Sequence, residues 1–545
     1  MIRFIFVLMA LLWPTELFAV DTEEMQEAFL ETLQIQPARF LGVEGNGMDS
    51  ESIDLKLWEL YHDNNLQGFW VSTNGPGKRA KAILDALQAT GSHGLDPQRY
   101  FADRIEKYWN STDALNLARL DILLTLGLRN YVWDLRFGRS EPRKLDPELF
   151  ASARNVDVDW DQITEQALST PNIEAFLDEQ MPPYSQYKKL MKVLAEYRAI
   201  ENKGGWDMVP EGKVLKPDMQ NERVGLIRKR LAVTGDLASD HLDGMIYDNE
   251  VVEAVKAFQS RHGLTADGVV GAKTLSAMNV PVDSRIRQIL VNMERYRWLS
   301  HHMEEPFIAV NIAGFRAGGV NKGVFEIEMP VIVGREYHET PVFSDAIKYI
   351  EFNPYWNVPT SIAMDEMLPK LKKNPNYLKE RNFRVFSSWE PDAKELDSTA
   401  LDWQGMGRKD IARLHIRQEP GPRNALGTVK FMFPNKYSVY LHDTPSHSLF
   451  KMEKRAFSHG CIRVSKPAEL AAYILGGEAE GFGIEHINEI IASGKRKVVV
   501  LKKPFPVLIL YRTLVVDPES GKINFREDVY GRDALLEKAL FCANP

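Results

Sequence analysis

A scarce cysteine beside a histidine is the feature of this sequence that could do chemistry. Cys461 lies in the run Ser458-His459-Gly460-Cys461-Ile462-Arg463, and the chain has only 2 cysteines, of which the other is Cys542. A thiol with an imidazole nearby is the minimum needed for a thiolate nucleophile and its general base. A thiol is mostly protonated at neutral pH, so it needs such a partner before it can attack. The run therefore predicts a nucleophile at Cys461.

Two histidines compete for the role of general base. His442 lies in the run Tyr440-Leu441-His442-Asp443-Thr444, well before Cys461 along the chain. On a strand Tyr440 and His442 project to one face, and the end of a strand can face a loop that contains the cysteine. His459 is adjacent to the cysteine, but neighbours in an extended segment point to opposite sides. We therefore favour His442 as the base and expect His459 to support the loop.

Main-chain and charged groups near Cys461 could complete such a site. Gly460 permits a tight backbone, so the N–H groups of Gly460 and Cys461 can point at the oxyanion that forms during attack on a carbonyl. Arg463 can hold a substrate carboxylate by a bidentate pair, and Arg455 is the second candidate, with a solvated surface charge as its alternative. Asp443 would point away from the face of His442, so we expect a turn or cap role rather than a Cys-His-Asp triad. The residues expected to bind substrate or support the site are Tyr440, Ser458, His459 and Arg463.

Cys461 could instead have a structural role. In an oxidising compartment Cys461 and Cys542 could form a disulfide, which would inactivate a catalytic thiol. A zinc site could be assembled from His442, His447, His459 and Cys461, but no CxxC, HxxxH or HExxH spacing supports it. We therefore expect no metal and no cofactor.

Composition limits the class of protein. The 545 residues exceed what one hydrophobic core supports, so several domains are expected. Hydrophobic residues make up 44% and charged residues 26%, which is ordinary for a folded protein. The net charge of −8 argues against nucleic acid as a partner.

The N-terminus has the features of an export signal. Arg3 gives a positive start, the apolar stretch Phe4 to Trp13 is short for a membrane span, and Leu17-Phe18-Ala19 ends in a small residue at a cleavage position. We expect a signal peptide over residues 1–19, with an uncleaved anchor as the alternative. No other stretch is long and apolar enough for a membrane helix, so no stable membrane span is expected after cleavage.

Periodicity and turn signals divide the rest of the chain. Residues 35–220 show apolar residues at helical spacing and predict a helical scaffold domain. Residues 222–280 predict short helices, of which one begins at Asn249 as its N-cap and stops at Gly263. Residues 305–515 predict a mostly β domain with two late helices. The predicted fold class is thus α+β with several domains.

Within the predicted β domain, residues 353–423 are rich in Pro, Asn, Trp and charge, and predict a capping insert or lid rather than a passive loop. Residues 516–545 are expected to form a C-terminal extension. The expected strands are Phe307 to Ile312, Val324 to Val333, Ile347 to Phe352, Val429 to Phe433, Tyr437 to His442, Lys497 to Leu501 and Val507 to Val516.

Two parts of the sequence resemble known families. The stretch AVKAFQSRHGLTADGVVGAKTLSAMN is similar to the small three-helix peptidoglycan-binding domains. His442 followed by Ser458-His459-Gly460-Cys461-Ile462-Arg463 resembles the motif of the L,D-transpeptidase family, whose catalytic unit is the YkuD domain. The stretches FNPYWNVPTSIA, RQEPGPRNALG and YLHDTPS resemble the large YcbB-type branch of that family.

The resemblance implies a cell-wall enzyme. Cys461 would attack the third residue of a tetrapeptide stem, and His442, oriented by a backbone carbonyl, would accept the thiol proton and return it to the departing D-alanine. The side-chain amine of a second stem would resolve the thioester into a 3→3 cross-link, whereas water would make the protein a carboxypeptidase. Acylation by carbapenems and a periplasmic location in a Gram-negative-type envelope are also implied.

The resemblance also bears on partners. Peptidoglycan peptide stems, as tetrapeptide donor and amine acceptor, are the expected partners, and other cell-wall synthesis proteins remain open. Whether residues 222–280 bind glycan or act as a spacer is left open too. The alternative from another functional class is a non-catalytic scaffold that binds the wall.

Overall fold

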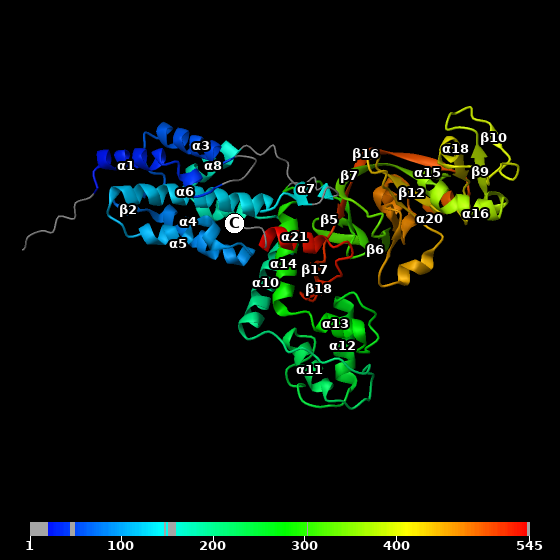
Figure 1. Cartoon of the computed structure of the whole chain (residues 1–545), viewed down its shortest axis with the longest axis horizontal. Helices are drawn as coiled ribbons and strands as arrows, with labels where there is room; N and C mark the ends of the chain where they lie inside the picture. Colours follow the sequence, from blue (N-terminus) through cyan, green and yellow to red (C-terminus); the bar gives the residue numbers. More distant parts are fainter. Residues whose placement is uncertain (1–19, 44–48, 146–148, 151–159, 302, 542–545) are drawn as a thin grey trace, which may run out of the picture. The chain divides into compact units, whose positions relative to one another are not determined.

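Figure 1 shows a computed structural model of the chain. The structure describes residues 20–43, 49–145, 149–150, 160–301 and 303–541. The expected signal peptide and Cys542 lie outside the described residues. The chain divides into two compact units, of which the first holds residues 1–137 and 156–182 and the second holds residues 138–155 and 183–545. Each unit is described by itself.

The first unit is helical and is organised by a buried carboxylate. Asp121, fully buried on the long helix α6, accepts a hydrogen bond from the Tyr61 hydroxyl at 2.7 Å and from the backbone N–H groups of Trp70 and Val71, each at 2.8 Å. Burial raises the pKa of Asp121 to about 6. The elements are α1 (Thr22–Gln34), α2 (Pro37–Phe40), α3 (Ser50–Asp63), β1 (Val71–Ser72), β2 (Gly75–Pro76), α4 (Lys78–Gln88), η1 (Ala89–His93), η2 (Pro97–Tyr100), α5 (Ala102–Tyr108), α6 (Ala114–Phe137), α8 (Trp160–Ser169) and α9 (Ile173–Gln180).

The expected helical domain over 35–220 does not form one unit, since its last long helix α10 (Ser185–Asn202) belongs to the second unit. There α10 packs against α14 (Val282–Arg297), which also packs against the C-terminal helix α21 (Arg532–Phe541) (Figure 1). The short elements α7 (Pro142–Leu145) and β3 (Leu149–Phe150) are part of this unit as well.

A small helical domain follows α10 within the second unit. It comprises α11 (Arg223–Val233), α12 (Asn249–Arg261) and α13 (Ala272–Met278), which pack around a core of their own. The N-cap of α12 is Asp248 rather than Asn249, because the Asp248 carboxylate accepts the Val251 N–H at 3.1 Å. Gly263 has φ +71°, the left-handed conformation expected where a helix stops.

The β domain is a sheet that closes on itself. Its strand order is β12-β13-β15-β6-β5-β4-β16-β7-β3, and β12 also pairs with β7. The enclosed core is apolar, and the helices α19 (Pro467–Ile474) and α20 (Ile484–Ala492) contribute buried side chains to it. The strands are β4 (Phe307–Asn311), β5 (Arg316–Asn321), β6 (Val324–Gly334), β7 (Val342–Phe352), β12 (Val429–Met432), β13 (Leu441–His442), β14 (Ala456–Ser458), β15 (Ile462–Val464) and β16 (Lys497–Leu510), with the hairpin β17 (Leu514–Val516) and β18 (Ile523–Phe525) after them. The predicted α+β fold class is confirmed.

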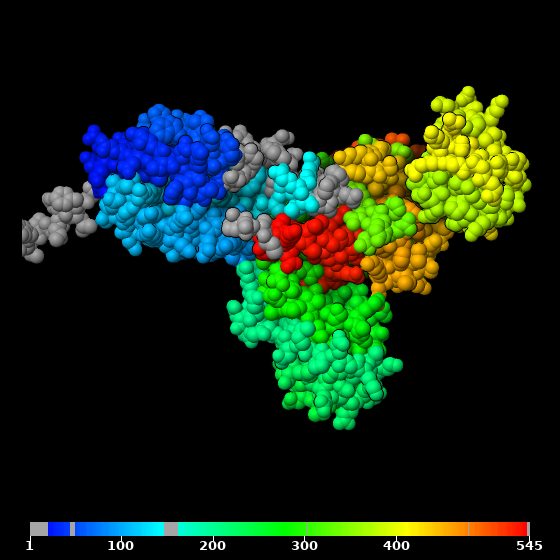
Figure 2. All heavy atoms as spheres, in the orientation of Figure 1, coloured from blue at the N-terminus to red at the C-terminus, as the bar shows by residue number. Residues whose placement is uncertain are grey.

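The insert between β7 and β12 is a folded subdomain. The strands of the insert form a separate sheet in the order β10-β9-β11-β8. Its buried residues, among them Leu371 and Trp403, form a separate core. In Figure 2 its residues, drawn yellow, gather in a lobe of their own. Its elements are β8 (Trp356–Asn357), α15 (Thr360–Ile362), η3 (Ala363–Met367), α16 (Leu368–Lys373), α17 (Tyr377–Glu380), β9 (Phe383–Phe386), β10 (Glu395–Leu396), α18 (Arg408–Arg413) and β11 (His415–Gln418).

The expected strands Lys497 to Leu501 and Val507 to Val516 are instead joined in β16, which ends at Leu510 and is followed by β17. Two further details also differ from the expected strands. The predicted strand Tyr437 to His442 is shortened to β13, because the Asn435 side chain accepts the Tyr437 N–H at 3.0 Å and donates to the Val439 carbonyl at 2.7 Å, which bends the chain into a turn. The strand β5, which contains Gly318 and Gly319, was not expected. Among the helices that the structure describes, none has the length and apolar character required to cross a membrane.

Candidate active site around Cys461

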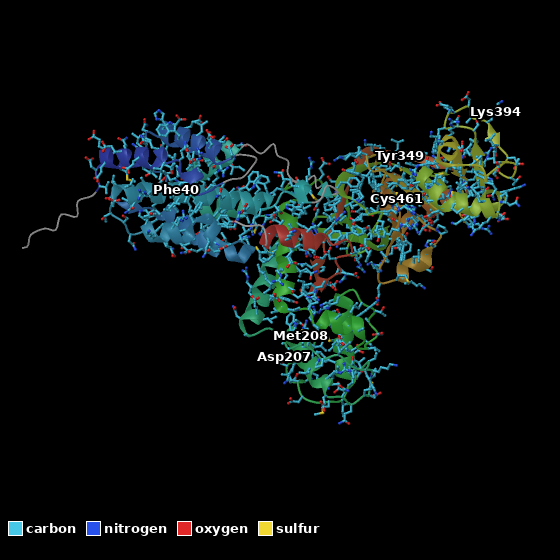
Figure 3. All side chains as sticks on the ribbon, viewed as in Figure 1. Phe40, Asp207, Met208, Tyr349, Lys394 and Cys461 are labelled. Atoms are coloured by element: carbon cyan, nitrogen blue, oxygen red, sulfur yellow. The ribbon has the colours of Figure 1, made fainter. Side chains whose placement is uncertain are left out.

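The candidate nucleophile lies between two strands at one end of the closed sheet. Cys461 follows β14 and precedes β15, which pairs in parallel with β13 so that Leu441 is opposite Ile462. The Cys461 Sγ lies 3.7 Å from the Ser438 carbonyl oxygen, and within the described part of the chain Cys461 is a free cysteine. Cys461 is labelled in Figure 3. The pairing brings the two distant runs of the sequence, around His442 and around Cys461, side by side.

The loop that presents Cys461 is held by its own side chains. The Ser458 hydroxyl donates to the Cys461 carbonyl at 2.5 Å and accepts the Gly460 N–H at 3.1 Å, while the Thr340 hydroxyl donates to the Gly460 carbonyl at 2.8 Å. Gly460 has φ +109°, a conformation that strains any residue with a Cβ. Ser458 and Thr340 thus fix the backbone on both sides of Gly460.

This geometry changes the expectation for the oxyanion donors. The Gly460 N–H is already donated to Ser458, so it is not directed at a substrate in this structure. No hydrogen bond of the Cys461 N–H is found among the residues that the structure describes. Of the two amides expected at the oxyanion, the Cys461 amide is therefore the one available.

His442 is buried and oriented by a carbonyl. Its Nδ1 lies 2.5 Å from the Asp443 carbonyl oxygen, so an Nδ1–H donates there and leaves the lone pair on Nε2. Burial, with Arg463 as the next contribution, lowers the pKa of His442 to about 3, which keeps the ring neutral at physiological pH. The Asp443 carboxylate instead accepts from the Thr428 N–H and hydroxyl, each at 2.8 Å. Asp443 thus anchors a turn, as the sequence indicated.

A row of polar residues crosses the sheet beside the thiol. The registers place Glu351 of β7 opposite Lys430 of β12, Lys430 opposite His442, and His442 opposite Arg463. Directly paired residues project to the same face of a sheet, so these four side chains share a face. His442 and Arg463 were predicted from the sequence as site residues, whereas Lys430 and Glu351 were not. The charged residue Lys430 within the apolar run Val429 to Phe433 was the signal that could have found it.

Burial and the neighbouring polar groups have opposite effects on the pKa of the Cys461 thiol. Burial raises the pKa of Cys461, while the Tyr440 N–H and hydroxyl, then Lys430 and Arg463, act to lower it. The Lys430 Nζ lies 4.1 Å from the centre of the Tyr440 ring, and burial lowers the pKa of this lysine. Tyr440 and His442 are in ring contact, with centroids 5.6 Å apart. Burial has the larger effect, so the resting thiol is protonated and needs a base.

Comparison with known proteins shows what this part of the chain is similar to. Residues 305–500 match the family model described as "L,D-transpeptidase catalytic domain". The β domain of this chain is thus similar to L,D-transpeptidase catalytic domains. Residues 220–278 match a "Putative peptidoglycan binding domain", and residues 56–194 match a "Scaffold domain".

Two individual proteins extend the comparison. Over 258 residues the chain is 33% identical to a "Putative L,D-transpeptidase" of Haemophilus influenzae. The aligned residues make up 47% of this chain and 50% of the relative. The chain therefore spans about half the length of this curated relative. The crystal structure of an L,D-transpeptidase (residues 123–326) from Xylanimonas cellulosilytica is 14% identical, covers 55% of this chain and 99% of that chain, and has a TM-score of 0.17. That score is too low to support a structural argument.

The insert contacts the L,D-transpeptidase motif at His459. His459 Nε2 lies 2.6 Å from a Glu366 carboxylate oxygen on η3 of the insert and 2.9 Å from the Arg335 guanidinium. An Nε2–H donates to Glu366, whereas an unprotonated Nε2 accepts from Arg335, so the tautomer of His459 decides which bond forms. Burial lowers the pKa of His459, so this choice is made by a neutral ring at physiological pH. No motif or spacing in the sequence signalled Glu366 or Arg335.

The two arginines suggested as carboxylate ligands differ in position. Arg463 is part of the polar row, and its buried Nε has no hydrogen-bond partner among the described residues. An unsatisfied buried donor suits a ligand group. Arg455 instead donates to the carbonyl oxygens of Val331, Met452 and Phe315 at 3.3, 2.7 and 3.1 Å, so it is not the solvated charge considered as its alternative.

Proposed function

We propose that this protein is an L,D-transpeptidase that forms 3→3 cross-links in peptidoglycan through a thioester on Cys461, with release of D-alanine. The observation that supports this most directly is the pairing of β13 with β15, which brings the strand that ends at His442 alongside the strand that begins directly after Cys461. His442 is neutral, and the Asp443 carbonyl holds its Nδ1. A neutral thiol and a neutral imidazole whose proton is on Nδ1 are the correct protonation states for attack assisted by a general base.

In the proposed acylation, His442 Nε2 takes the thiol proton as the Cys461 sulfur attacks the carbonyl carbon of the third stem residue. The carbonyl electrons move to oxygen, and the Cys461 N–H stabilises the resulting oxyanion. When the carbonyl re-forms, the bond to D-alanine breaks and the His442 imidazolium protonates the departing amine. A thioester and a free D-alanine result. The unsatisfied Nε–H of Arg463 is available to donate to a stem carboxylate.

In the proposed second half, the side-chain amine of another stem attacks the thioester carbonyl. His442 accepts a proton from the amine, the bond to sulfur breaks, and the thiol is restored when the proton returns. The new amide is the cross-link. Water in place of the amine would give a shortened stem and an L,D-carboxypeptidase reaction. The substrate implies an extracytoplasmic site of action, and we propose the periplasm, with peptidoglycan stems as partners.

The test is incubation of the purified protein with disaccharide-tetrapeptide, followed by mass spectrometry. We expect cross-linked dimers that have lost one D-alanine, and a carbapenem adduct on the peptide that contains Cys461. Cys461→Ala abolishes both products, and His442→Ala slows dimer formation by about 10²-fold or more. Cys542→Ala is the matched control and retains activity.

Two other results would change the assignment. Shortened stems without dimers would identify an L,D-carboxypeptidase. Absence of dimers, shortened stems and thioester adduct, with Cys461 reduced, would refute catalysis and leave a wall-binding scaffold.

A further inference from the structure

A large cavity lies away from the polar row, between the small helical domain and the catalytic domain of the second unit. Its volume is about 1070 Å³. It is lined by residues of four segments, which lie within 260–285, 313–316, 451–455 and 525–527, and by none of the residues assigned to catalysis. Typical pockets for small molecules have volumes of about 300–1,000 Å³, so this cavity has room for part of a larger ligand.

The lining of this cavity is strongly basic. It contains seven Lys and Arg side chains and two carboxylates, although the whole chain has a net charge of −8. The basic residues are Lys273, Arg285, Arg316, Lys451, Lys454, Arg455 and Arg526. A concentration of one charge in a concave surface attracts ligands of the opposite charge. The cavity is therefore suited to an anion.

Pairing within the protein neutralises only part of this charge. Glu453 contacts Lys273 at 2.6 Å, and Glu527 contacts Lys454 at 3.4 Å. Arg316 pairs at 2.7 Å with Glu328, which lies outside the lining. Arg455 and Arg526 donate to backbone carbonyls, which satisfy their N–H groups but leave their charge uncompensated. Burial and then the neighbouring arginines lower the pKa of Arg526 to about 10. The uncompensated charge is available to a bound carboxylate.

The cavity is also connected to the catalytic loop. The segment 451–455 forms part of the lining and continues directly into β14 and Cys461. Glu453 of this segment accepts from the Thr265 N–H at 2.8 Å, which joins the segment to the small domain. A ligand in the cavity would touch both domains and the chain that leads to the nucleophile.

We propose that this cavity binds an anionic peptidoglycan strand through the carboxylates of its peptide stems, and so holds the polymer whose other stems react at Cys461. The inference rests on the proposed function for the identity of the ligand. The ligand class follows from the cavity itself, which is large and lined by an excess of basic side chains.

The test is a binding measurement that does not depend on turnover. The full mature chain with Cys461→Ala is titrated against fluorescently labelled soluble peptidoglycan strands with tetrapeptide stems, and Kd is measured by anisotropy at several salt concentrations. Lys451→Glu with Lys454→Glu reverses two exposed charges of the lining, and we expect Kd to rise by about tenfold and the salt dependence to weaken. Lys213→Glu is the matched control, an exposed lysine of the small domain outside the cavity, and should bind like its parent.

Two ligand controls complete the experiment. Strands with amidated stem carboxylates should bind about as weakly as the double variant binds normal strands. Equal Kd values for the parent and a double variant with an unchanged melting temperature would overturn the proposal, and so would equally tight binding of neutral chitooligosaccharides. Wild-type turnover of disaccharide-tetrapeptide is measured separately. If turnover is absent but binding depends on charge, the proposed function fails and the cavity assignment survives.

Discussion

At the scale of single residues, the site is built to keep both reacting groups neutral before substrate arrives. His442 is neutral because it is buried and flanked by Arg463, and Lys430 lies opposite it in the sheet. Cys461 is protonated because burial outweighs the groups that favour the thiolate. A preformed thiolate–imidazolium pair would require a raised histidine pKa and a lowered cysteine pKa, which is the reverse of both shifts.

The pH dependence of alkylation tests this neutral pair. A raised pKa of Cys461 means that the thiolate fraction at pH 7 is smaller than for a free cysteine. The rate of alkylation by iodoacetamide should therefore keep rising beyond about pH 8.5, the ordinary thiol pKa. Since His442 has a pKa of about 3, it should add no inflection between pH 5 and 7. The modified peptide is quantified by mass spectrometry, and a fast plateau at pH 6 would contradict the neutral pair.

Lys430 supplies a positive charge that partly offsets the burial of the thiol. Removing it in Lys430→Met should raise the pKa of Cys461 further, because a cation that favours the thiolate is lost. Alkylation at pH 7.5 should slow by about tenfold or less, and the pH profile should shift upward. Lys436→Met removes an exposed lysine nearby and is the control. If both variants react alike, the role of Lys430 in tuning the thiol is disproved.

At the scale of secondary-structure elements, residue types revealed more than periodicity did. The expected strands Phe307 to Ile312 and Val324 to Val333 correspond closely to β4 and β6, since both runs are rich in the β-branched and aromatic residues that favour strands. The expected strand Tyr437 to His442 begins with a turn that was not predicted. The turn forms because the Asn435 side chain takes backbone hydrogen-bonding groups that a strand would otherwise use.

The candidate site was predictable only in part, for a related reason. Cys461 and His442 could be singled out because their side chains are rare and reactive. Lys430 and Glu351 enter the site only through the register of β7, β12 and β13, and Glu366 enters through the packing of the insert on the motif. Such long-range pairings are not encoded in any local pattern, so a single sequence does not reveal them.

The contact between Glu366 of η3 and His459, next to Cys461, predicts what holds the insert against the β domain. Glu366→Gln removes the negative charge that faces His459 and Arg335, a partly exposed interaction worth about 1 kcal/mol or less. Amide hydrogen exchange over residues 363–373 should accelerate by up to about fivefold. Glu390→Gln changes an exposed glutamate elsewhere in the insert and should leave that exchange unchanged. Equal exchange in both variants would show that Glu366 does not hold the insert.

At the scale of the whole molecule, the second unit combines the small helical domain, which matches a putative peptidoglycan-binding family, with the β domain, which matches L,D-transpeptidase catalytic domains. A single carboxylate makes several of the contacts between them. Glu453 of the catalytic domain accepts from the Thr265 N–H at 2.8 Å and the Thr265 hydroxyl at 2.5 Å, and pairs with Lys273 at 2.6 Å. These hydrogen bonds lower the pKa of Glu453 to about 2. A carboxylate with a lowered pKa stabilises the folded arrangement above its ordinary pKa of about 4.5, and this contribution is lost as the pH falls toward 2.

Glu453→Gln should therefore loosen the small domain from the catalytic domain at neutral pH without unfolding either. The amide can still accept one hydrogen bond but loses the charge that pairs with Lys273, so hydrogen exchange at Thr265 and limited proteolysis within 263–268 and 451–455 should both accelerate. Glu527→Gln is the matched control, because Glu527 lines the same cavity but contacts only the exposed Lys454 among the ion pairs of the described chain. Equal hydrogen exchange and equal proteolysis in Glu453→Gln and Glu527→Gln would contradict this prediction. The two domains would then be held together by their remaining packing and not by Glu453.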